Sequence, residues 1–183
     1  SNREKTKMVN LFDWCGESVK ENPKLYLSDY PEYRLPCIKN YDPQDLNDYK
    51  NMKVHQKAPF IACGDFDGNG KIDVAAIVEK TKKDVEAIKE ERNKKGELVV
   101  FLNDGSSYKT IKLPGDFLYG VYWVCVITHS RGKTIEGWGD PAIPESVGTV
   151  SLQTDGLELI KFESWAKLFY WDKGKFKELV TSD

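Results

Sequence analysis

The residues best suited to chemistry lie in one segment, 65–73, which reads Asp-Phe-Asp-Gly-Asn-Gly-Lys-Ile-Asp. Oxygen-bearing side chains occupy every second position at its start, and a further carboxylate closes it. Gly70 permits a sharp chain reversal, and Lys71 can offer its backbone carbonyl. Calcium takes about six to eight oxygen ligands, and this spacing lets one tight coil place several of them around one point. The sequence therefore predicts a calcium site with these ligands: Asp65, Asp67, Asn69, the carbonyl of Lys71 and Asp73.

A hairpin turn without any ion is the alternative interpretation of the same residues. Asp and Asn side chains commonly stabilise such turns by hydrogen bonds to nearby backbone N–H groups. Three carboxylates in one short coil, however, repel one another unless a cation lies between them. We therefore expect an occupied loop. Because it lacks a bidentate Glu, its Kd should be about 10⁻⁴–10⁻³ M, as in extracellular calcium modules.

The sequence around the loop excludes one calcium motif and favours another. An EF-hand has a bidentate Glu at its twelfth position, whereas this chain has Ala76 there and strand-like flanks. The run Asp-Phe-Asp-Gly-Asn-Gly-Lys-Ile-Asp-Val-Ala between two strands resembles the calcium loop of FG-GAP or VCBS-type repeats. The resemblance is specific over residues 60–78 and extends loosely to residue 113. It implies one blade-like sheet of four strands and these ligands: Asp65, Asp67, Asn69, the carbonyl of Lys71 and Asp73.

A complete propeller is not expected from this resemblance. The chain has one such loop and no paired Phe-Gly and Gly-Ala-Pro motif, whereas a closed propeller needs several blades. Family members with a single loop are usually exported proteins, so the resemblance implies a bacterial exported protein. A modest calcium affinity also suits calcium-rich surroundings outside the cytosol.

The elements that must position the loop are mostly strands. Short apolar or β-branched runs separated by Asn, Asp and Gly turns give about nine candidates: 60–63, 72–78, 98–102, 108–113, 119–128, 147–153, 157–162, 166–171 and 176–180. We expect hairpins to join 98–102 to 108–113, 147–153 to 157–162, and 166–171 to 176–180. The most hydrophobic run, 119–128, should be a central strand buried on both faces.

The remaining segments complete a single domain of residues 1–183, with an irregular first part and a β-rich core over 60–183. Apolar residues at helical spacing predict a short N-terminal helix over 8–21, and proline-rich residues 22–59 should wrap the sheet, with one helical turn after Asp42 as its cap. The charged stretch 80–97 should be a solvated excursion. The predicted fold class is mainly β (α+β): an antiparallel twisted sheet or sandwich with a short N-terminal helix, not a closed propeller.

Charge and hydropathy limit the partners and the compartment. The chain has 27 basic and 29 acidic side chains, so it lacks the basic surplus by which proteins bind nucleic acid. It also lacks an apolar run of the roughly 18 residues that a membrane span requires. Because residues 1–7 are polar, we expect an export signal to be absent from the printed sequence. The expected location is periplasmic, outer-membrane lipoprotein or secreted, and any lipid anchor would lie outside these residues.

Four cysteines leave two alternatives open. If the protein is exported, a bridge from Cys15 to Cys37 is the expected pairing, because both flank a loop-rich region. Otherwise all four, including Cys63 and Cys125, are small buried apolar residues.

A second candidate site is the long loop 129–145, which presents Trp138 between two glycines together with Arg131 and Asp140. An aromatic side chain with polar neighbours suits a protein or carbohydrate partner, although Trp138 could equally cover the open end of the core. On a closing hairpin, residues 165, 169 and 171 are aromatic and should share one core face. The sequence thus favours an exported, calcium-stabilised, β-rich binding or interaction module without an assigned catalytic residue. The alternative is an envelope protein that is hydrolase-like or enzyme-inhibitor-like and uses this loop, for example through His129.

Overall fold

The computed structural model of the protein describes residues 9–16, 22–54, 56–80, 96–114 and 120–183. Within them the strands form a five-stranded sheet, a four-stranded sheet and a two-stranded ribbon, and their pairing is antiparallel. The expected fold class, mainly β with antiparallel sheets and no closed propeller, is confirmed. The predicted excursion over 80–97 lies largely outside the described residues.

The first sheet contains the candidate calcium loop. Its strands are β1 (Tyr33–Arg34), β2 (Ile61–Gly64), β3 (Asp73–Lys80), β4 (Gly96–Asn103) and β5 (Tyr108–Leu113). From β2 to β5 the strands pair in sequence order, as expected, while β1 pairs with the end of β3. β3 is a continuous run of small and β-branched residues that is buried on both faces, which is typical of a strand covered by two layers.

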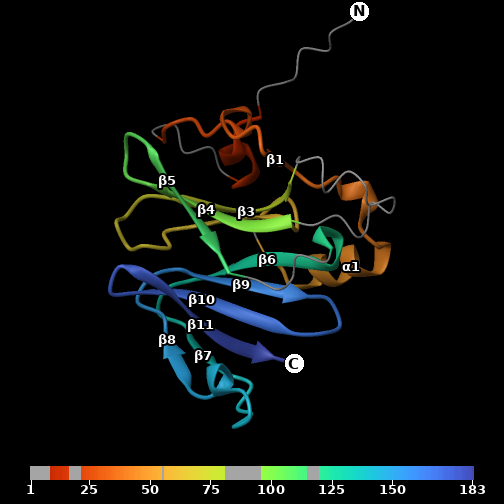
Figure 1. Ribbon diagram of the computed structural model, residues 1–183, viewed down its shortest axis with the longest axis vertical. Coiled ribbons are helices and arrows are strands. Elements are labelled where there is room, and N and C mark those ends of the chain that lie inside the picture. Colours follow the sequence, from red (N-terminus) through yellow and green to blue (C-terminus); the bar gives the residue numbers. More distant parts are fainter. Residues whose placement is uncertain (1–8, 17–21, 55, 81–95, 115–119) are drawn as a thin grey trace, which may run out of the picture.

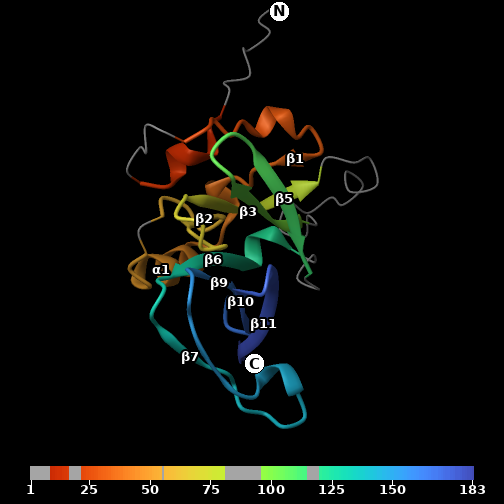
Figure 2. The same cartoon turned by 90° about the vertical axis from the view of Figure 1, so that its left-hand side faces the viewer.

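The second sheet consists of β6 (Val124–His129), β9 (Gly156–Lys161), β10 (Ala166–Asp172) and β11 (Lys175–Ser182), in the order β11-β10-β9-β6. The ribbon pairs β7 (Thr134–Glu136) with β8 (Thr149–Ser151). In Figure 1 the ribbon, the second sheet and the first sheet are stacked in this order, and the turned view in Figure 2 keeps it. The second sheet is therefore the middle layer.

The two faces of the middle layer bury different clusters. On β10, Phe169 packs in the main core between the sheets, whereas its neighbour Leu168 packs with Leu152 and Leu179 beneath the ribbon. Successive side chains of a strand point to opposite faces, which explains this division. Trp165 and Trp171 pack against the main core, so the predicted aromatic face is confirmed.

The predicted hairpin between residues 147–153 and 157–162 is wrong. β8 pairs with β7, where Ile135 faces Val150, and β9 pairs with β6 and β10 instead. The Thr154-Asp155-Gly156 segment carries the chain from the ribbon to the middle layer rather than reversing it. Alternating apolar residues indicated the strands correctly, but they did not indicate their partners.

The predicted central position of the strand within 119–128 is also wrong. β6 is an edge strand, and a 3₁₀ turn, η5 (Val121–Trp123), precedes it. The apolar side chains of β6 are buried because this strand lies against the first sheet. Two hydrogen bonds show the contact: the Val126 N–H donates to the Pro59 carbonyl at 2.9 Å, and the Thr128 hydroxyl donates to the Cys63 carbonyl at 2.9 Å. The free edge of β6 thus lies along β2, where the two sheets meet.

The helix predicted over residues 8–21 is not found in residues 9–16, the part of that segment that the structure describes. In the described part of that segment only η1 (Leu11–Trp14) is helical, as a 3₁₀ turn followed by Gly16 at φ 86°. In the part of the chain that the structure describes, the α-helix is α1 (Pro43–Asn51), which Asp42 caps as predicted, with Gln44 N–H donating to Asp42 Oδ1 at 2.8 Å. Besides η1 and η5, the described residues contain the 3₁₀ turns η2 (Leu27–Asp29), η3 (Ile38–Asn40) and η6 (Pro144–Ser146).

One disulfide joins the N-terminal segment to the first sheet. It links Cys15 to Cys63, with Cα atoms 5.6 Å apart, so the expected partner Cys37 is wrong. Cys37 is exposed and free, and Cys125 is free and buried. The pairing follows from packing: Trp14 contacts Phe60 with ring centroids 5.3 Å apart, which brings η1 next to β2.

Replacing both Cys15 and Cys63 with Ser should lower the free energy of unfolding by about 4 kcal/mol, because the bridge spans 48 residues and restricts the unfolded chain. Urea unfolding monitored by fluorescence measures this loss. Cys37→Ser is the control, since that thiol is exposed and free. Equal destabilisation by the control would contradict the assignment of the bridge.

Candidate metal centre

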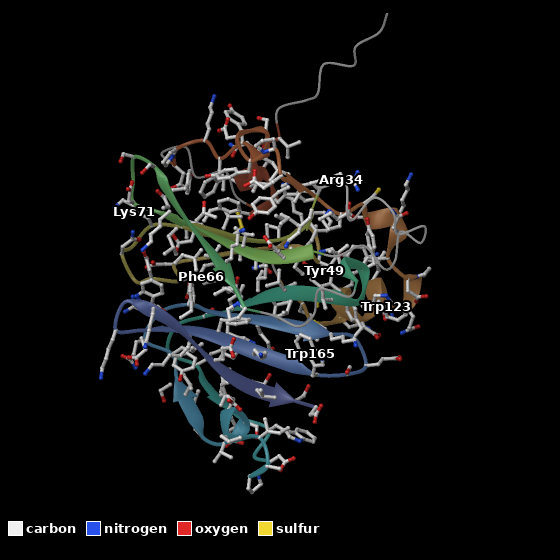
Figure 3. All side chains as sticks on the ribbon, viewed as in Figure 1. Arg34, Tyr49, Phe66, Lys71, Trp123 and Trp165 are labelled. Atoms are coloured by element: carbon white, nitrogen blue, oxygen red, sulfur yellow. A yellow bond between two sulfur atoms is a disulfide. The ribbon has the colours of Figure 1, made fainter. Side chains whose placement is uncertain are left out.

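The candidate loop connects β2 to β3. Gly64 pairs with Asp73, so residues 65–72 close a hairpin between the two strands. Phe66 is fully buried, and Figure 3 shows it between the two sheets. Gly68 and Gly70 have φ values of 78° and 83°, a conformation that glycine adopts without a steric penalty. Strand pairing therefore holds both ends of the loop, and Phe66 anchors it to the core.

Three of the five predicted ligands come together. Asp65, Asp67 and Asp73 each offer a carboxylate oxygen, and these oxygens lie within 4.8 Å of one another. Asn69 and Lys71 belong to the same loop: the Asn69 amide donates to the Asn103 carbonyl at 2.7 Å, and the Lys71 side chain lies over Gly105. The geometry therefore assembles the carboxylate part of the predicted site.

Hydrogen bonds of the Asx type also shape this loop. Asp65 accepts from the N–H groups of Gly68 and Gly70, both at 2.9 Å, and Asp67 accepts from Asn69 N–H at 3.1 Å. A carboxylate has about four lone-pair sites, so these bonds leave acceptor capacity for a cation. The bonds preform the coil and are compatible with a bound ion.

Asp73 is the most perturbed carboxyl group of the site. It is fully buried and accepts from the N–H groups of Phe66 and Asn103, each at 2.8 Å. Burial raises its pKa to about 7, with further contributions from Asp67 and Asp65, although the two hydrogen bonds oppose the shift. Burial, and to a smaller extent the charge of Asp65, also raises the pKa of Asp67. A positive ion between these groups would relieve the unfavourable charge.

Sequence reasoning missed Asp155, which fixes the loop from the other sheet. Its carboxylate accepts from Asp65 N–H at 2.8 Å and from Arg131 N–H at 2.9 Å, and its own N–H donates to the Asp65 carbonyl at 3.1 Å. Beside it, the Thr154 hydroxyl donates to the Phe66 carbonyl at 2.9 Å. The only sequence signal was a turn-like Thr-Asp-Gly, because the loop residues that it contacts lie 88 to 90 positions away.

Asn103, at the end of β4, is the second missed residue. Its buried side chain donates to the Ile72 carbonyl at 3.2 Å and to Asn22 Oδ1 at 3.0 Å, and its Oδ1 accepts from Gly105 N–H at 2.8 Å. Together with its backbone N–H bond to Asp73, these contacts attach the loop to the neighbouring turn. Asn103 therefore positions the predicted ligands from within the first sheet.

The second predicted site does not form one cluster. Trp138 is 52% exposed, so it does not cover the core. Its backbone N–H donates to the Val180 carbonyl at 2.9 Å. Strand β7 separates it from Arg131, which is exposed at the preceding turn. Asp140 accepts from Ala142 N–H at 2.8 Å and shapes its own turn. Of the three residues, only Trp138 remains an obvious contact surface.

His129 is engaged in the second sheet. Its Nε2 lies 3.0 Å from Glu158 Oε1, and the Thr181 hydroxyl donates to Glu158 Oε2 at 2.7 Å. Burial alone would raise the pKa of Glu158, but the hydrogen bonds from His129 and Thr181 outweigh it and lower the pKa. These three side chains, from β6, β9 and β11, stabilise the second sheet. The other histidine, His55, lies outside the described residues.

Comparisons with protein-family models, with curated proteins and with solved structures find no match to this chain. Among the described residues, no helix is long and apolar enough to cross a membrane. Inferences about function therefore depend on the chemistry of the sites themselves.

Asp155→Ala should lower the free energy of unfolding by about 1–3 kcal/mol, because two backbone N–H groups lose a charged acceptor. Hydrogen exchange should show faster exchange at Asp65 and Arg131, the two donors. Asp29→Ala is the matched control, since that aspartate is exposed on η2. Unchanged exchange at both donors would contradict the role of Asp155.

Acid should weaken the fold through Glu158. A carboxylate with a lowered folded-state pKa stabilises fully above its unfolded value of about 4.3, and this contribution is lost as the pH falls through the folded-state pKa. Glu158→Gln should therefore reduce stability at pH 7 and flatten the decline between about pH 5 and pH 3. Denaturant unfolding at several pH values measures both effects. Glu145→Gln, at an exposed position, should keep the wild-type slope.

Proposed function

We propose that the protein is an exported binding module whose loop 65–73 binds a stabilising calcium ion. The observation that supports this most directly is the group formed by Asp65, Asp67 and Asp73, whose oxygens lie within 4.8 Å of one another in a strand-loop-strand hairpin. The predicted ligands are all hard oxygen donors, which suits calcium better than zinc or copper. Asn69 and the carbonyl of Lys71 would complete the protein part of the coordination.

The bound ion would act structurally. Asp73 begins β3, Phe66 enters the core, and Asp65 is bonded to Asp155 of the other sheet. An ion held by Asp65 and Asp73 would therefore stabilise the β2–β3 hairpin and the junction of the two sheets. Its effect should appear in the unfolding equilibrium.

Export is supported by the disulfide between Cys15 and Cys63, because such bridges persist mainly in oxidising compartments. The periplasm, the outer membrane through a lipid anchor, and the extracellular medium all fit this chemistry. The modest calcium affinity expected of the loop fits the same surroundings.

A binding role is supported by exposed aromatic surface. Trp138 and Trp123 are 52% and 44% exposed, and exposed tryptophans are frequent anchors for protein or carbohydrate partners. The hydrolase-like or inhibitor-like alternative has less support, because His129 is bonded to Glu158 and Asp140 to its own turn. We therefore favour binding over catalysis.

Calcium should raise the melting temperature, and Asp67→Asn should abolish the rise. At about 10 mM calcium, the expected Kd gives roughly 1.4–2.7 kcal/mol and an increase in Tm of about 3–10 °C. Asp67 is the suitable position because it is partly exposed, whereas Asp73 is buried and holds two backbone N–H groups. Differential scanning calorimetry with and without calcium measures the shift.

Two controls make this experiment specific. Asp104→Asn changes an aspartate in the adjacent β4–β5 turn, outside the carboxylate group, and should keep the calcium response. Magnesium at equal ionic strength should give a smaller rise, because it demands tighter octahedral geometry. An undiminished calcium response in Asp67→Asn would exclude the loop as the calcium site.

A further inference from the structure

A mainly apolar pocket of about 270 Å³ lies beside α1. Three parts of the described chain line it: the turn η3, the helix α1 and the residues that follow the helix. Its apolar wall consists of Ile38, Leu46, Tyr49, Val54 and Pro59. Small-molecule sites typically have about 300–1,000 Å³ and mostly apolar walls, so this pocket fits a ligand smaller than a typical drug.

Hydrogen bonds within the protein hold the walls of the pocket in place. The hydroxyl of Tyr49, which is buried and labelled in Figure 3, donates to the Ala58 carbonyl at 2.9 Å. This bond ties α1 to the segment after it. The Gln56 amide donates to the Thr128 hydroxyl of β6 at 3.2 Å, which anchors the same segment to the second sheet. A preformed cavity of this kind binds a ligand without first losing much conformational freedom of its own.

Two lysines supply the charge of the pocket. Lys50, near the end of α1, and Lys57, after the helix, are both exposed. Lys57 Nζ donates to the Asp13 carbonyl at 3.0 Å, which uses one of its three N–H donors. Among the described residues, neither lysine pairs with a carboxylate, and no acidic residue lines the pocket. The pocket therefore attracts anions.

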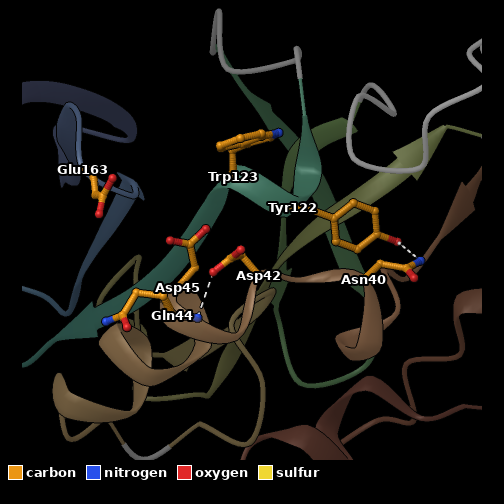
Figure 4. A pocket seen from close by; sticks show the side chains of 7 residues that line it. All are labelled: Asn40, Asp42, Gln44, Asp45, Tyr122, Trp123 and Glu163. Carbon is orange, nitrogen blue, oxygen red and sulfur yellow. Dashed lines mark hydrogen bonds between the residues drawn. The ribbon is translucent and has the colours of Figure 1, made fainter.

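The carboxylates at the start of α1 lie elsewhere. Asp42 and Asp45 line a different pocket together with Glu163 (Figure 4). The two pockets thus differ in sign, because the helix begins with acidic residues and has Lys50 in its last turn. The C-terminal end of the helix adds about half a negative charge, which is less than the positive charge of two ammonium groups. An anion is therefore attracted to the apolar pocket and repelled from the acidic one.

The combination of an apolar wall and a basic rim selects the class of ligand. An inorganic anion would leave the apolar wall in contact with water, and a neutral hydrocarbon would make no use of the lysines. An amphipathic organic anion satisfies both parts. The small volume of the pocket favours a carboxylate, which is a compact head group that can accept hydrogen bonds from two ammonium groups at once.

We propose that this pocket binds a small aliphatic carboxylate. The head group accepts hydrogen bonds from Lys50 and Lys57 at the rim, and the aliphatic chain contacts Ile38, Leu46 and Val54. This site goes beyond the binding role proposed above, because the residues that line it include neither the exposed tryptophans nor the calcium loop. It therefore stands or fails independently of both.

Chemical-shift titration of the full chain at fixed ionic strength tests the proposal. A calcium chelator is present, so that bound calcium cannot recruit a carboxylate to the loop. The probes are hexanoate, its neutral counterpart n-hexanol, the cation n-hexylammonium, and acetate, which lacks the chain. We expect hexanoate to bind about threefold or more tighter than hexanol, and about tenfold or more tighter than acetate. The shifts should include the methyl groups of Ile38 and Val54, and n-hexylammonium should bind most weakly of the three hexyl probes.

Lysine variants separate the effect of charge from folding. The double variant Lys50→Gln with Lys57→Gln should weaken hexanoate binding about two- to tenfold and leave hexanol binding unchanged. Because both affinities are measured on the same protein, partial unfolding cannot change their ratio. Lys173→Gln with Lys175→Gln, at exposed positions of the β10–β11 turn, is the matched control and should keep the wild-type ratio.

The apolar wall has a variant of its own. Ile38 is 40% exposed, so it can be replaced with little effect on the core. Ile38→Ser should weaken hexanoate and hexanol by the same factor, about two- to fivefold, because both chains lose the same apolar contact. Val147→Ser is the control, since that residue is 55% exposed and lies outside the pocket, and it should change neither affinity.

Three results would overturn the proposal directly: no binding of hexanoate, equal or tighter binding of hexanol, or an unchanged affinity ratio in the lysine double variant. Tighter binding of acetyl-glycyl-leucine than of hexanoate would assign the pocket to a chain terminus of a partner protein, and a dimer that Ile38→Ser dissociates would assign it to a second copy. Either would also overturn it. Asp67→Asn should lose the calcium response and keep wild-type affinity for hexanoate, so failure of one site is distinguishable from failure of the other.

Discussion

The main core forms where the two sheets bury apolar faces against each other, and this contact positions the candidate loop. Phe60, Phe66, Phe101 and Phe169 are almost completely buried in the main core. Burying each of these side chains contributes about 1.5–3 kcal/mol. A hydrogen bond between neutral groups contributes less, about 0.5–1.5 kcal/mol. The sheets meet where β6 lies along β2, and Val126 bonds to Pro59 at that line.

Polar contacts then fix how the loop meets the second sheet. Asp155 accepts from Asp65 and Arg131, so one carboxylate joins the calcium loop, the middle layer and the start of the ribbon. Asn103 performs a similar task within the first sheet. Because these contacts hold the loop before any ion arrives, a bound cation would strengthen an existing junction. This arrangement explains why we expect a structural effect of calcium.

A separate group of contacts holds the turn η5 (Val121–Trp123). Glu79 is buried on β3 and pairs with Arg34 of β1 at 2.7 Å, while its other oxygen accepts from Tyr122. Tyr122 also accepts from Cys37 N–H at 3.1 Å, so this turn is tied both to the first sheet and to the N-terminal segment. Trp123, the next residue, is thereby held at the surface while its neighbours are buried.

Local chemistry allowed the sequence alone to determine the loop, most strands and the cap of α1. Asp42 caps Gln44 two residues away, and the alternating oxygens of the loop act within nine positions, so their spacing is visible in the chain. Only the tertiary structure decided the pairing of Cys15 with Cys63, the separate partners of β8 and β9, and the role of Asp155. The disulfide and the Asp65–Asp155 bond join residues 48 and 90 positions apart. Their partners are chosen by how the two sheets bury their faces, a choice that no local pattern records.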